Sequence, residues 1–148
     1  MKIKIYTDGA CAGNPGPGGW AAVIILENKK KELYGGEKLT TNNRMELTAA
    51  IKALEYCLTK EKKQSSFDHI KIYTDSNYVK DGITTWINNW EKNNWKTANK
   101  KNVKNIDLWK QLKKLVKSEK VDWFWVKGHS NNPMNNLADE LAKKATPI

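Results

Sequence analysis

Hydrophobic and polar residues alternate with a period of two in two short stretches that share one sequence, Lys-Ile-Tyr-Thr-Asp. The first copy covers residues 4–8 and the second covers residues 71–75. In each copy the isoleucine and threonine fall on one side of an extended chain, while the lysine, tyrosine and aspartate fall on the other. Alternation of this kind with β-branched residues predicts two β-strands.

Each of these predicted strands ends at an aspartate, Asp8 or Asp75, and the two aspartates are in the same phase. If the strands are parallel neighbours, about 4.8 Å apart, both carboxylates lie at the edge of the sheet where α/β proteins form ligand sites. Two ionised carboxylates this close repel, which suggests a cation between them. The alternative is a pair of exposed acids that open turns. The sequences that follow the two copies differ, so no duplicated structural unit is indicated.

The same alternation predicts three further strands, at residues 20–26, 32–39 and 121–126. The glycine-rich stretch 9–19 is predicted to be a tight loop whose glycines let another backbone approach closely. It leads into a strand and not a helix, so it is not a phosphate-binding loop. The first three strands should form an antiparallel meander.

Helical periodicity predicts four helices. The first two cover residues 44–58 and 76–90, with Gly82 a flaw in the second. The third carries Leu108, Leu112 and Leu115 on its inner side, and the last follows Pro133 with Leu137, Leu141 and Ala145 as its buried face. The pattern therefore predicts a mixed α/β sheet with helices on its faces, in a single domain that spans residues 1–148.

Two further acids fall on the predicted helices. Glu46 heads a row of small residues that would let the first helix lie close to the sheet, where a carboxylate is unexpected without a function. The alternative is a capping box formed by Asn43 and Glu46. Asp139 adjoins the buried face of the last helix, and its alternative role is an ion pair with Lys143. Together with Asp8 and Asp75, these oxygen-only ligands suit Mg²⁺ or Mn²⁺.

The charge of the chain is strongly positive: 26 basic residues against 16 acids give a net charge of +10. Residues 92–117 contain nine lysines and a single acid, Asp107, with Trp95 and Trp109 interleaved. A basic surface with planar rings predicts a polyanionic partner. A generally lysine-rich proteome is the alternative, and it would make the same residues a solvated face.

The cysteines and the hydropathy bear on the compartment. Cys11 and Cys57 fall in a glycine-rich loop and a helical run, which favours reduced thiols and a cytoplasmic location over a disulfide framework. No apolar run approaches the roughly 20 residues of a membrane span, and no signal peptide is visible.

Six segments, in this order and spacing, resemble bacterial ribonuclease HI over essentially the whole chain: YTDG at 6–9, GNPGPGG at 13–19, TTNNRMEL at 40–47, YTDS at 73–76, WKTA at 95–98 and WVKGH at 125–129. The resemblance implies a ribonuclease H-like fold with a five-stranded mixed sheet, in which strands 4 and 5 are parallel. It also implies a monomeric hydrolase that cuts the RNA strand of RNA/DNA hybrids endonucleolytically. Two Mg²⁺ ions, with Mn²⁺ as a substitute, would serve as cofactors, and the products would carry 5′-phosphate and 3′-hydroxyl ends.

The resemblance also implies roles for individual residues. The metal-binding carboxylates would be Asp8, Glu46, Asp75 and Asp139, and His129 would assist proton transfer and product release. The residues expected to contact the hybrid are Cys11, Asn14, Asn42 and Asn43 at the minor groove, Thr41 near a DNA phosphate, Asn77 and the aromatic channel Tyr78, Trp86 and Trp90, and Lys96, Lys100 and Lys101 of a basic protrusion at residues 92–104. The chain departs from the family at Asn131, usually a glycine, at Asn136, commonly a glutamate, and at Asn77, frequently a glutamine.

Three other functions would use the same features. A non-catalytic nucleic-acid-binding module needs only the basic groove and the tryptophans, but four acids would weaken it unless cations occupied them. A receiver-like phosphoacceptor domain predicts alternating parallel units, whereas this chain begins with a meander. A strand-transfer enzyme would share the sheet, but the minor-groove residues favour a ribonuclease.

Overall fold

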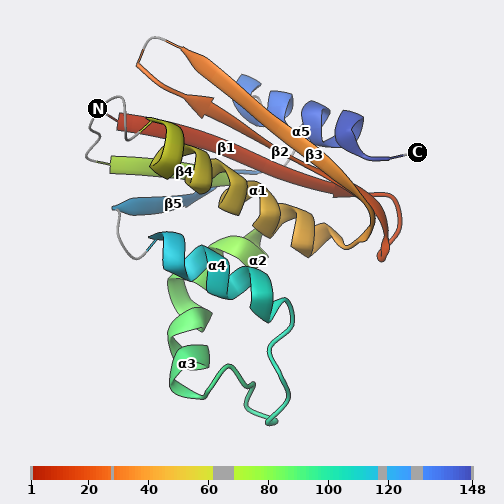
Figure 1. Cartoon of the computed structure of the whole chain (residues 1–148), viewed down its shortest axis with the longest axis vertical. Helices are drawn as coiled ribbons and strands as arrows, with labels where there is room; N and C mark the ends of the chain where they lie inside the picture. Colours follow the sequence, from red (N-terminus) through yellow and green to blue (C-terminus); the bar gives the residue numbers. More distant parts are fainter. Residues whose placement is uncertain (1, 28, 62–68, 117–119, 128–131, 148) are drawn as a thin grey trace.

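The computed structural model describes the chain except for residues 1, 28, 62–68, 117–119, 128–131 and 148. The strands in this part of the chain form one sheet in the order β3-β2-β1-β4-β5 (Figure 1). Their bounds are Lys2–Cys11 for β1, Gly16–Ile25 for β2, Lys30–Thr40 for β3, His69–Thr74 for β4 and Val121–Trp125 for β5. Strands β1 to β3 pair antiparallel, whereas β4 pairs parallel with both β1 and β5. The predicted five-stranded mixed sheet is therefore confirmed.

Helices cover both faces of this sheet, as predicted. Their bounds are Asn42–Tyr56 for α1, Asn77–Asp81 for α2, Ile87–Lys92 for α3, Ile106–Val116 for α4 and Pro133–Ala145 for α5. Helix α1 ends in a π-helical turn, Cys57–Glu61, and a second π-helical turn, Gly82–Trp86, joins α2 to α3. Helices α1 and α5 both contact β1 and β2, on opposite faces (Figure 1). No helix in the described ranges combines the length and the apolar character needed to cross a bilayer.

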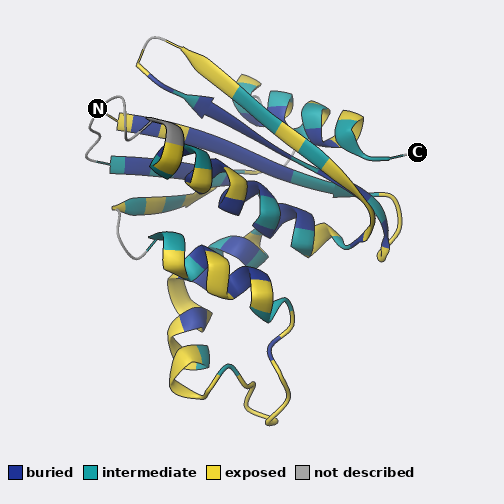
Figure 2. Ribbon diagram, in the orientation of Figure 1, coloured by how far each residue is buried: buried dark blue, intermediate teal, exposed yellow. Residues whose placement is uncertain are grey.

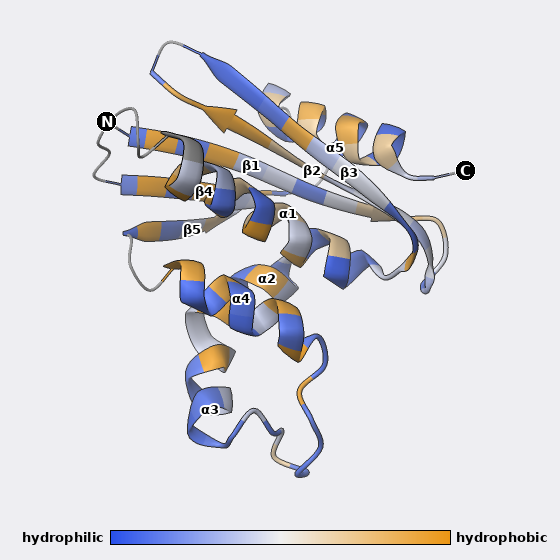
Figure 3. Cartoon of the chain, viewed as in Figure 1, coloured by the Kyte–Doolittle hydropathy of each residue, from blue (hydrophilic) through white to orange (hydrophobic). Residues whose placement is uncertain are grey.

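Two hydrophobic clusters follow from the period-two alternation of β1 and β4. Ile3, Ile5, Ile70 and Ile72 are fully buried on the α1 side. Tyr6 is on the other side, in a smaller cluster under α5. Figure 2 shows β1 buried over most of its length, and Figure 3 shows that this buried strand includes polar as well as apolar residues, whereas the loop after α3 is mostly exposed and polar.

The predicted buried face of the last helix is confirmed only in part. Leu137 and Leu141 pack against the cluster of Tyr6 but are half-buried, as is Ala145. The fully buried residues of α5 are Asn135, Ala138 and Ala142. The reason is the close approach of α5 to the sheet: a Cβ added to Gly19 of β2 would lie 2.2 Å from the carbonyl oxygen of Ala142. Because small residues meet at this contact, the leucines pack along the flanks of the helix.

The glycine-rich stretch is shorter as a loop than predicted. Strand β1 continues to Cys11 and β2 begins at Gly16, with Cys11 paired to Gly18. The expected close approach of another backbone does occur. A Cβ on Gly9 would lie 2.6 Å from the backbone nitrogen of Glu46. Gly9 therefore lets the first turns of α1 press directly against the end of β1.

Candidate active site

The carboxyl ends of β1 and β4 place Asp8 and Asp75 side by side. The two strands are parallel, and their register pairs Thr7 with Thr74, the residues just before the two acids. One carboxylate oxygen from each of Asp8, Glu46 and Asp75 lies within 4.8 Å of the others. Asp8 is 4% exposed, so the alternative of two exposed turn-opening acids is wrong for this residue.

Glu46 reaches this cluster from α1. The helix is capped by Thr41, whose hydroxyl accepts a hydrogen bond of 3.2 Å from the backbone N–H of Arg44. Glu46 lies beyond this first turn and is 3% exposed, so the alternative of an Asn43–Glu46 capping box is wrong. Its Oε1 accepts no hydrogen bond from the described part of the protein. A buried polar atom without a partner is costly, and a cation bound between the carboxylates would satisfy it.

Asp139 lies at the edge of the cluster, on α5. Its Oδ2 is 3.0 Å from Nζ of Lys143, so the alternative ion pair does form. The charge of Asp139 helps to raise the pKa of Asp8, so the two carboxylates are close enough to interact. The fourth predicted acid therefore lies beside Asp8, although it is outside the group of three whose oxygens are within 4.8 Å of one another.

Burial and mutual repulsion make this a proton-binding site when no cation is present. The pKa of Asp8 is raised from 3.8 to about 8, mainly by desolvation and then by the charge of Asp75 and a hydrogen bond with Asp139. Burial also raises the pKa of Glu46 well above its usual range, followed by the charges of Asp8 and Asp75. A divalent cation favours the ionised carboxylates and would displace these protons. Oxygen ligands without a cysteine or histidine in the group fit a hard cation such as Mg²⁺.

The turn after β1 meets the N-terminus of α1 beside the carboxylates. Oδ1 of Asn14 accepts a hydrogen bond of 3.2 Å from the backbone N–H of Asn42. Sγ of Cys11 is 3.5 Å from the carbonyl oxygens of both Gly16 and Thr40. The structure thus brings together the residues that the sequence assigned to the minor groove and to a nearby phosphate, namely Cys11, Asn14, Thr41, Asn42 and Asn43.

The predicted aromatic channel is a packed cluster of rings. The centroids of Tyr78 and Trp86 are 5.9 Å apart, as are those of Trp86 and Trp90. Trp86 is 37% exposed and presents a ring to solvent. Trp109 was expected on the basic surface, and this was wrong: it is fully buried, and its Nε1 donates a hydrogen bond of 3.1 Å to Oη of Tyr78. Trp109 therefore supports the aromatic cluster from inside the protein. The helical periodicity of α4 could have predicted its burial, because Trp109 is next to the inward-facing Leu108.

The basic segment, residues 92–104, extends away from the sheet after α3 (Figure 1). Its lysines are exposed, including Lys96, Lys100 and Lys101, which we call the protrusion lysines. A hollow of about 310 Å³ lies between this segment and the aromatic cluster, with Asn43, Trp90 and Lys101 in its lining. The candidates for the minor groove, the aromatic channel and the basic segment therefore adjoin one another.

Two further positions from the sequence analysis are exposed. Asn77 is exposed at the start of α2, and Asn136 is exposed in α5. His129, like Asn131, lies outside the described residues, so its predicted role stays a prediction.

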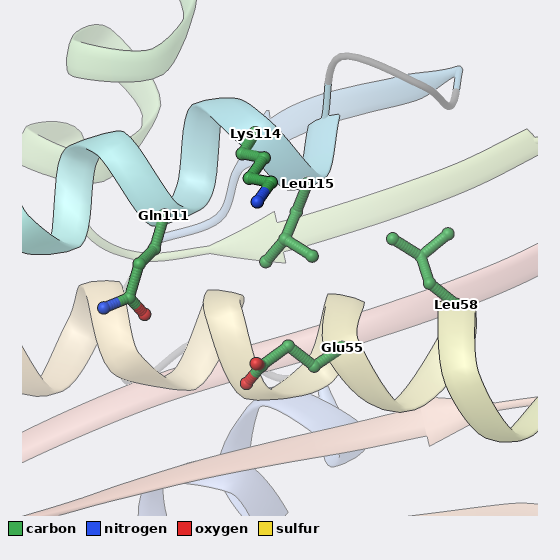
Figure 4. A pocket seen from close by; sticks show the side chains of 5 residues that line it. All are labelled: Glu55, Leu58, Gln111, Lys114 and Leu115. Atoms are coloured by element: carbon green, nitrogen blue, oxygen red, sulfur yellow. The ribbon is translucent and has the colours of Figure 1, made fainter.

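The hollow between α1 and α4 is a separate feature (Figure 4). It measures about 400 Å³, and Glu55 and Lys114 extend into the space between the two helices. Glu55 follows Glu46 by nine residues of helix, or roughly 13 Å at 1.5 Å per residue. This hollow is too distant from the carboxylate cluster to be part of the same site.

The sequence profile of the RNase H family matches residues 1–146. The chain belongs to the RNase H family. The chain is 56% identical to the Ribonuclease H of Parvibaculum lavamentivorans over 96% of this chain and 90% of that protein. It is 52% identical to the Ribonuclease H of Treponema denticola over 98% and 97% of the two chains. The enzyme is therefore a hydrolase of the ribonuclease H type, and the resemblance found in the sequence is confirmed.

Solved structures agree on the fold. LC9-RNase H1, a type 1 RNase H with the type 2 active-site motif, superposes with a TM-score of 0.86 at 29% identity, over 98% of this chain and 72% of that chain. LC11-RNase H1 in complex with an RNA/DNA hybrid superposes with a TM-score of 0.73 at 24% identity, over 97% and 96% of the two chains. The ribonuclease H fold is thus supported by structure as well as by sequence.

Proposed function

We propose that the enzyme hydrolyses the RNA strand of RNA/DNA hybrids at the carboxylate cluster of Asp8, Glu46 and Asp75, with Asp139 beside it. The observation that carries this proposal is the buried Glu46: its Oε1 has no hydrogen-bond partner in the described part of the chain, and one of its carboxylate oxygens lies within 4.8 Å of two further carboxylates. Such a group is costly in a binding module, because it repels a polyanion, but it is useful where cations are bound against a phosphate.

The three clustered carboxylates would bind two Mg²⁺ ions, for which Mn²⁺ could substitute. When bound, the two ions would activate the attacking water and stabilise the leaving oxygen. Asp139, whose charge acts on Asp8, would be the fourth carboxylate of this metal site. The oxygen of the water adds to phosphorus and the bond to the 3′-oxygen breaks, leaving a 5′-phosphate and, after protonation, a 3′-hydroxyl. His129 would move a proton in this step.

The residues around the cluster account for the choice of substrate. Asn14, Asn42 and Cys11 lie together beside the acids, where amide and thiol groups would contact a minor groove. In a hybrid the 2′-hydroxyls mark one strand only, and they line the wide minor groove. The aromatic cluster and the protrusion lysines would bind the other strand through ring contacts and phosphate charges. LC11-RNase H1, a protein of the same fold, is known in complex with such a hybrid.

We further place the enzyme in the cytoplasm as a monomer. A reducing compartment suits Cys57, which is buried at the end of α1, and the half-buried Cys11 on β1.

The proposal is tested by offering the enzyme one sequence as an RNA/DNA hybrid, as an RNA duplex and as a DNA duplex, each with Mg²⁺ and with EDTA. We expect cleavage of the RNA strand of the hybrid alone, and only with Mg²⁺. A 5′-phosphate-dependent exonuclease should degrade the downstream fragments. The Asp75→Asn variant serves as the control for contaminating nucleases. Tight hybrid binding without cleavage would instead favour a non-catalytic module, and cutting of all three duplexes would refute the assigned specificity.

A further inference from the structure

The N-terminal turn of α1 is connected to the base of the basic segment by a network around Arg44, the only arginine of the chain. Nη1 and Nη2 of Arg44 donate to Oδ1 and Oδ2 of Asp107, at 3.1 and 2.9 Å. Nη1 also donates to Oδ1 of Asn105 at 3.2 Å. The guanidinium therefore makes a bidentate pair and a third hydrogen bond, a geometry that a lysine cannot reproduce.

This network reaches the aromatic cluster through Asn105. Nδ2 of Asn105 donates a hydrogen bond of 3.1 Å to Oη of Tyr78. The carbonyl oxygen of Asn105 accepts from the backbone N–H groups of Leu108 and Trp109, which fixes the start of α4. Asn105 has a φ of 60°, a left-handed conformation that asparagine tolerates better than most residues. The residue that closes the basic segment is thus fixed to α1, to α4 and to the channel.

Stability alone does not account for this pair. The side chain of Arg44 is 33% exposed and that of Asp107 is 56% exposed, and ion pairs this accessible contribute little to the free energy of unfolding. Asp107 is also the only acid among the nine lysines of residues 92–117, where a single negative charge opposes the binding of a polyanion. We therefore attribute the role of Asp107 to the position in which it holds the basic segment.

The same turn of α1 connects to the other side of the site. The backbone N–H of Asn42, two residues before Arg44, donates to Asn14 in the turn after β1. One helical turn therefore joins the minor-groove candidates to the segment that carries the protrusion lysines. The segment is also held by Trp95, which packs against the core, and by Val103, its one buried residue, whose backbone N–H donates to the carbonyl oxygen of Trp95. The network around Arg44 is the contact that joins it to α1.

We infer that Arg44 is a positioning residue for substrate binding: through Asp107 and Asn105 it sets the distance between the minor-groove residues of α1 and the basic segment. This role rests on the proposed cleavage of RNA/DNA hybrids. In this role Arg44 contacts neither the phosphates nor the reacting atoms. Loss of its pairing with Asp107 therefore weakens binding of the hybrid and leaves the chemical step intact.

The decisive variant is Asp107→Asn, because two explanations predict opposite signs. If only charge mattered, removing the single acid of a basic surface would tighten hybrid binding and lower KM. If the network positions the segment, KM for the hybrid rises by about three- to tenfold, on the scale of one lost charge-assisted hydrogen bond. The value of kcat at saturating hybrid stays within about twofold, as expected when only uniform binding is lost.

Arg44→Lys and a double variant complete the test. Arg44→Lys keeps the charge and loses the bidentate geometry, so it should raise KM like Asp107→Asn. The double variant should be no worse than the weaker-binding single variant, because both changes break one interaction. Lys52→Gln is the control: it removes a positive charge from the same helix, and KM should match the parent. Asp107 is exposed and asparagine is nearly isosteric, so thermal unfolding should report an intact fold.

Hybrid binding by Asp107→Asn that equals or exceeds that of the parent would overturn the inference, and so would additive losses in the double variant. If the parent enzyme itself binds no hybrid, the proposed function is refuted as well. This outcome is seen without any variant, so the two failures can be told apart.

Discussion

Replacing Asp8 by asparagine should abolish cleavage and at the same time stabilise the fold in the absence of cations. The folded-state pKa of Asp8 is about 8, against 3.8 for an ordinary aspartate, so between these pH values the folded chain retains a proton that the unfolded chain has released. This contribution to stability is complete below about pH 4 and is lost as the pH rises through about 8. Asparagine cannot ionise, so the variant does not incur this loss.

The size of the effect follows from the shift in pKa. At about 1.36 kcal/mol per pKa unit, moving the pKa of Asp8 from 3.8 to about 8 corresponds to an upper limit of about 6 kcal/mol. Two factors make the effect smaller than this limit. Asp75 is only half-buried, so solvent screens its charge, and the acids that remain in the variant still repel one another. We therefore expect Asp8→Asn to exceed the parent by about 2–4 kcal/mol near pH 9, a large share of the 5–15 kcal/mol that is typical of such a domain.

The assay is urea unfolding in EDTA at about pH 5 and about pH 9, repeated with Mg²⁺. The difference between variant and parent should grow with pH. Mg²⁺ should stabilise the parent by binding its folded state, and this gain should shrink in the variant. Glu140→Gln, which removes an exposed acid from the neighbouring α5, should behave as the parent. Near-normal cleavage by pure Asp8→Asn in Mg²⁺ would refute the metal-site assignment, and a parent-like dependence of stability on pH would refute the electrostatic reasoning.

Three further predictions concern other parts of the chain. His129→Ala should lower kcat by about 10²-fold, at the low end of general acid–base assistance, with hybrid binding nearly unchanged; an unaltered kcat would make His129 an ordinary loop histidine. Changing the three protrusion lysines together to glutamine should raise KM and reduce the salt slope of hybrid affinity by at most about 2–3. An unchanged slope would mean that the segment is a solvated face. Gly82→Ala should lower the free energy of unfolding by about 1–3 kcal/mol, because the new Cβ would lie 2.1 Å from the ring of Trp109; a parent-like melting temperature would contradict this packing.

The helix bounds illustrate how far local patterns reach. Residues 44–58 were predicted as the first helix, and α1 covers Asn42–Tyr56 because Thr41, not a later residue, caps it. The stretch 76–90 was predicted as one helix, and the structure has α2, a π-helical turn from Gly82 and α3 in its place. Gly82 was noted as a flaw in the pattern. The structure gives the reason for it, since only glycine leaves room for the ring of Trp109.

The sequence by itself determined which residues of β1 and β4 share a face of the sheet. In a strand, successive side chains point to opposite faces, so a few residues are enough to show the pattern. That pattern placed Asp8 and Asp75 in the same phase, and the two strands do lie parallel and in register. The helical pattern and the resemblance also predicted Glu46 and Asp139 at this site, and the structure brings a carboxylate oxygen of Glu46 within 4.8 Å of those of Asp8 and Asp75.

Only the tertiary structure decided how those residues behave. The burial of Glu46 depends on its contact with Gly9, and the raised pKa of Asp8 depends on desolvation by segments far away in the chain. The pairing of Arg44 with Asp107 spans 63 positions. Periodicity reports the environment along one helix or strand, whereas burial and charge interactions depend on distances between elements, which are fixed only when the sheet and its helices pack together.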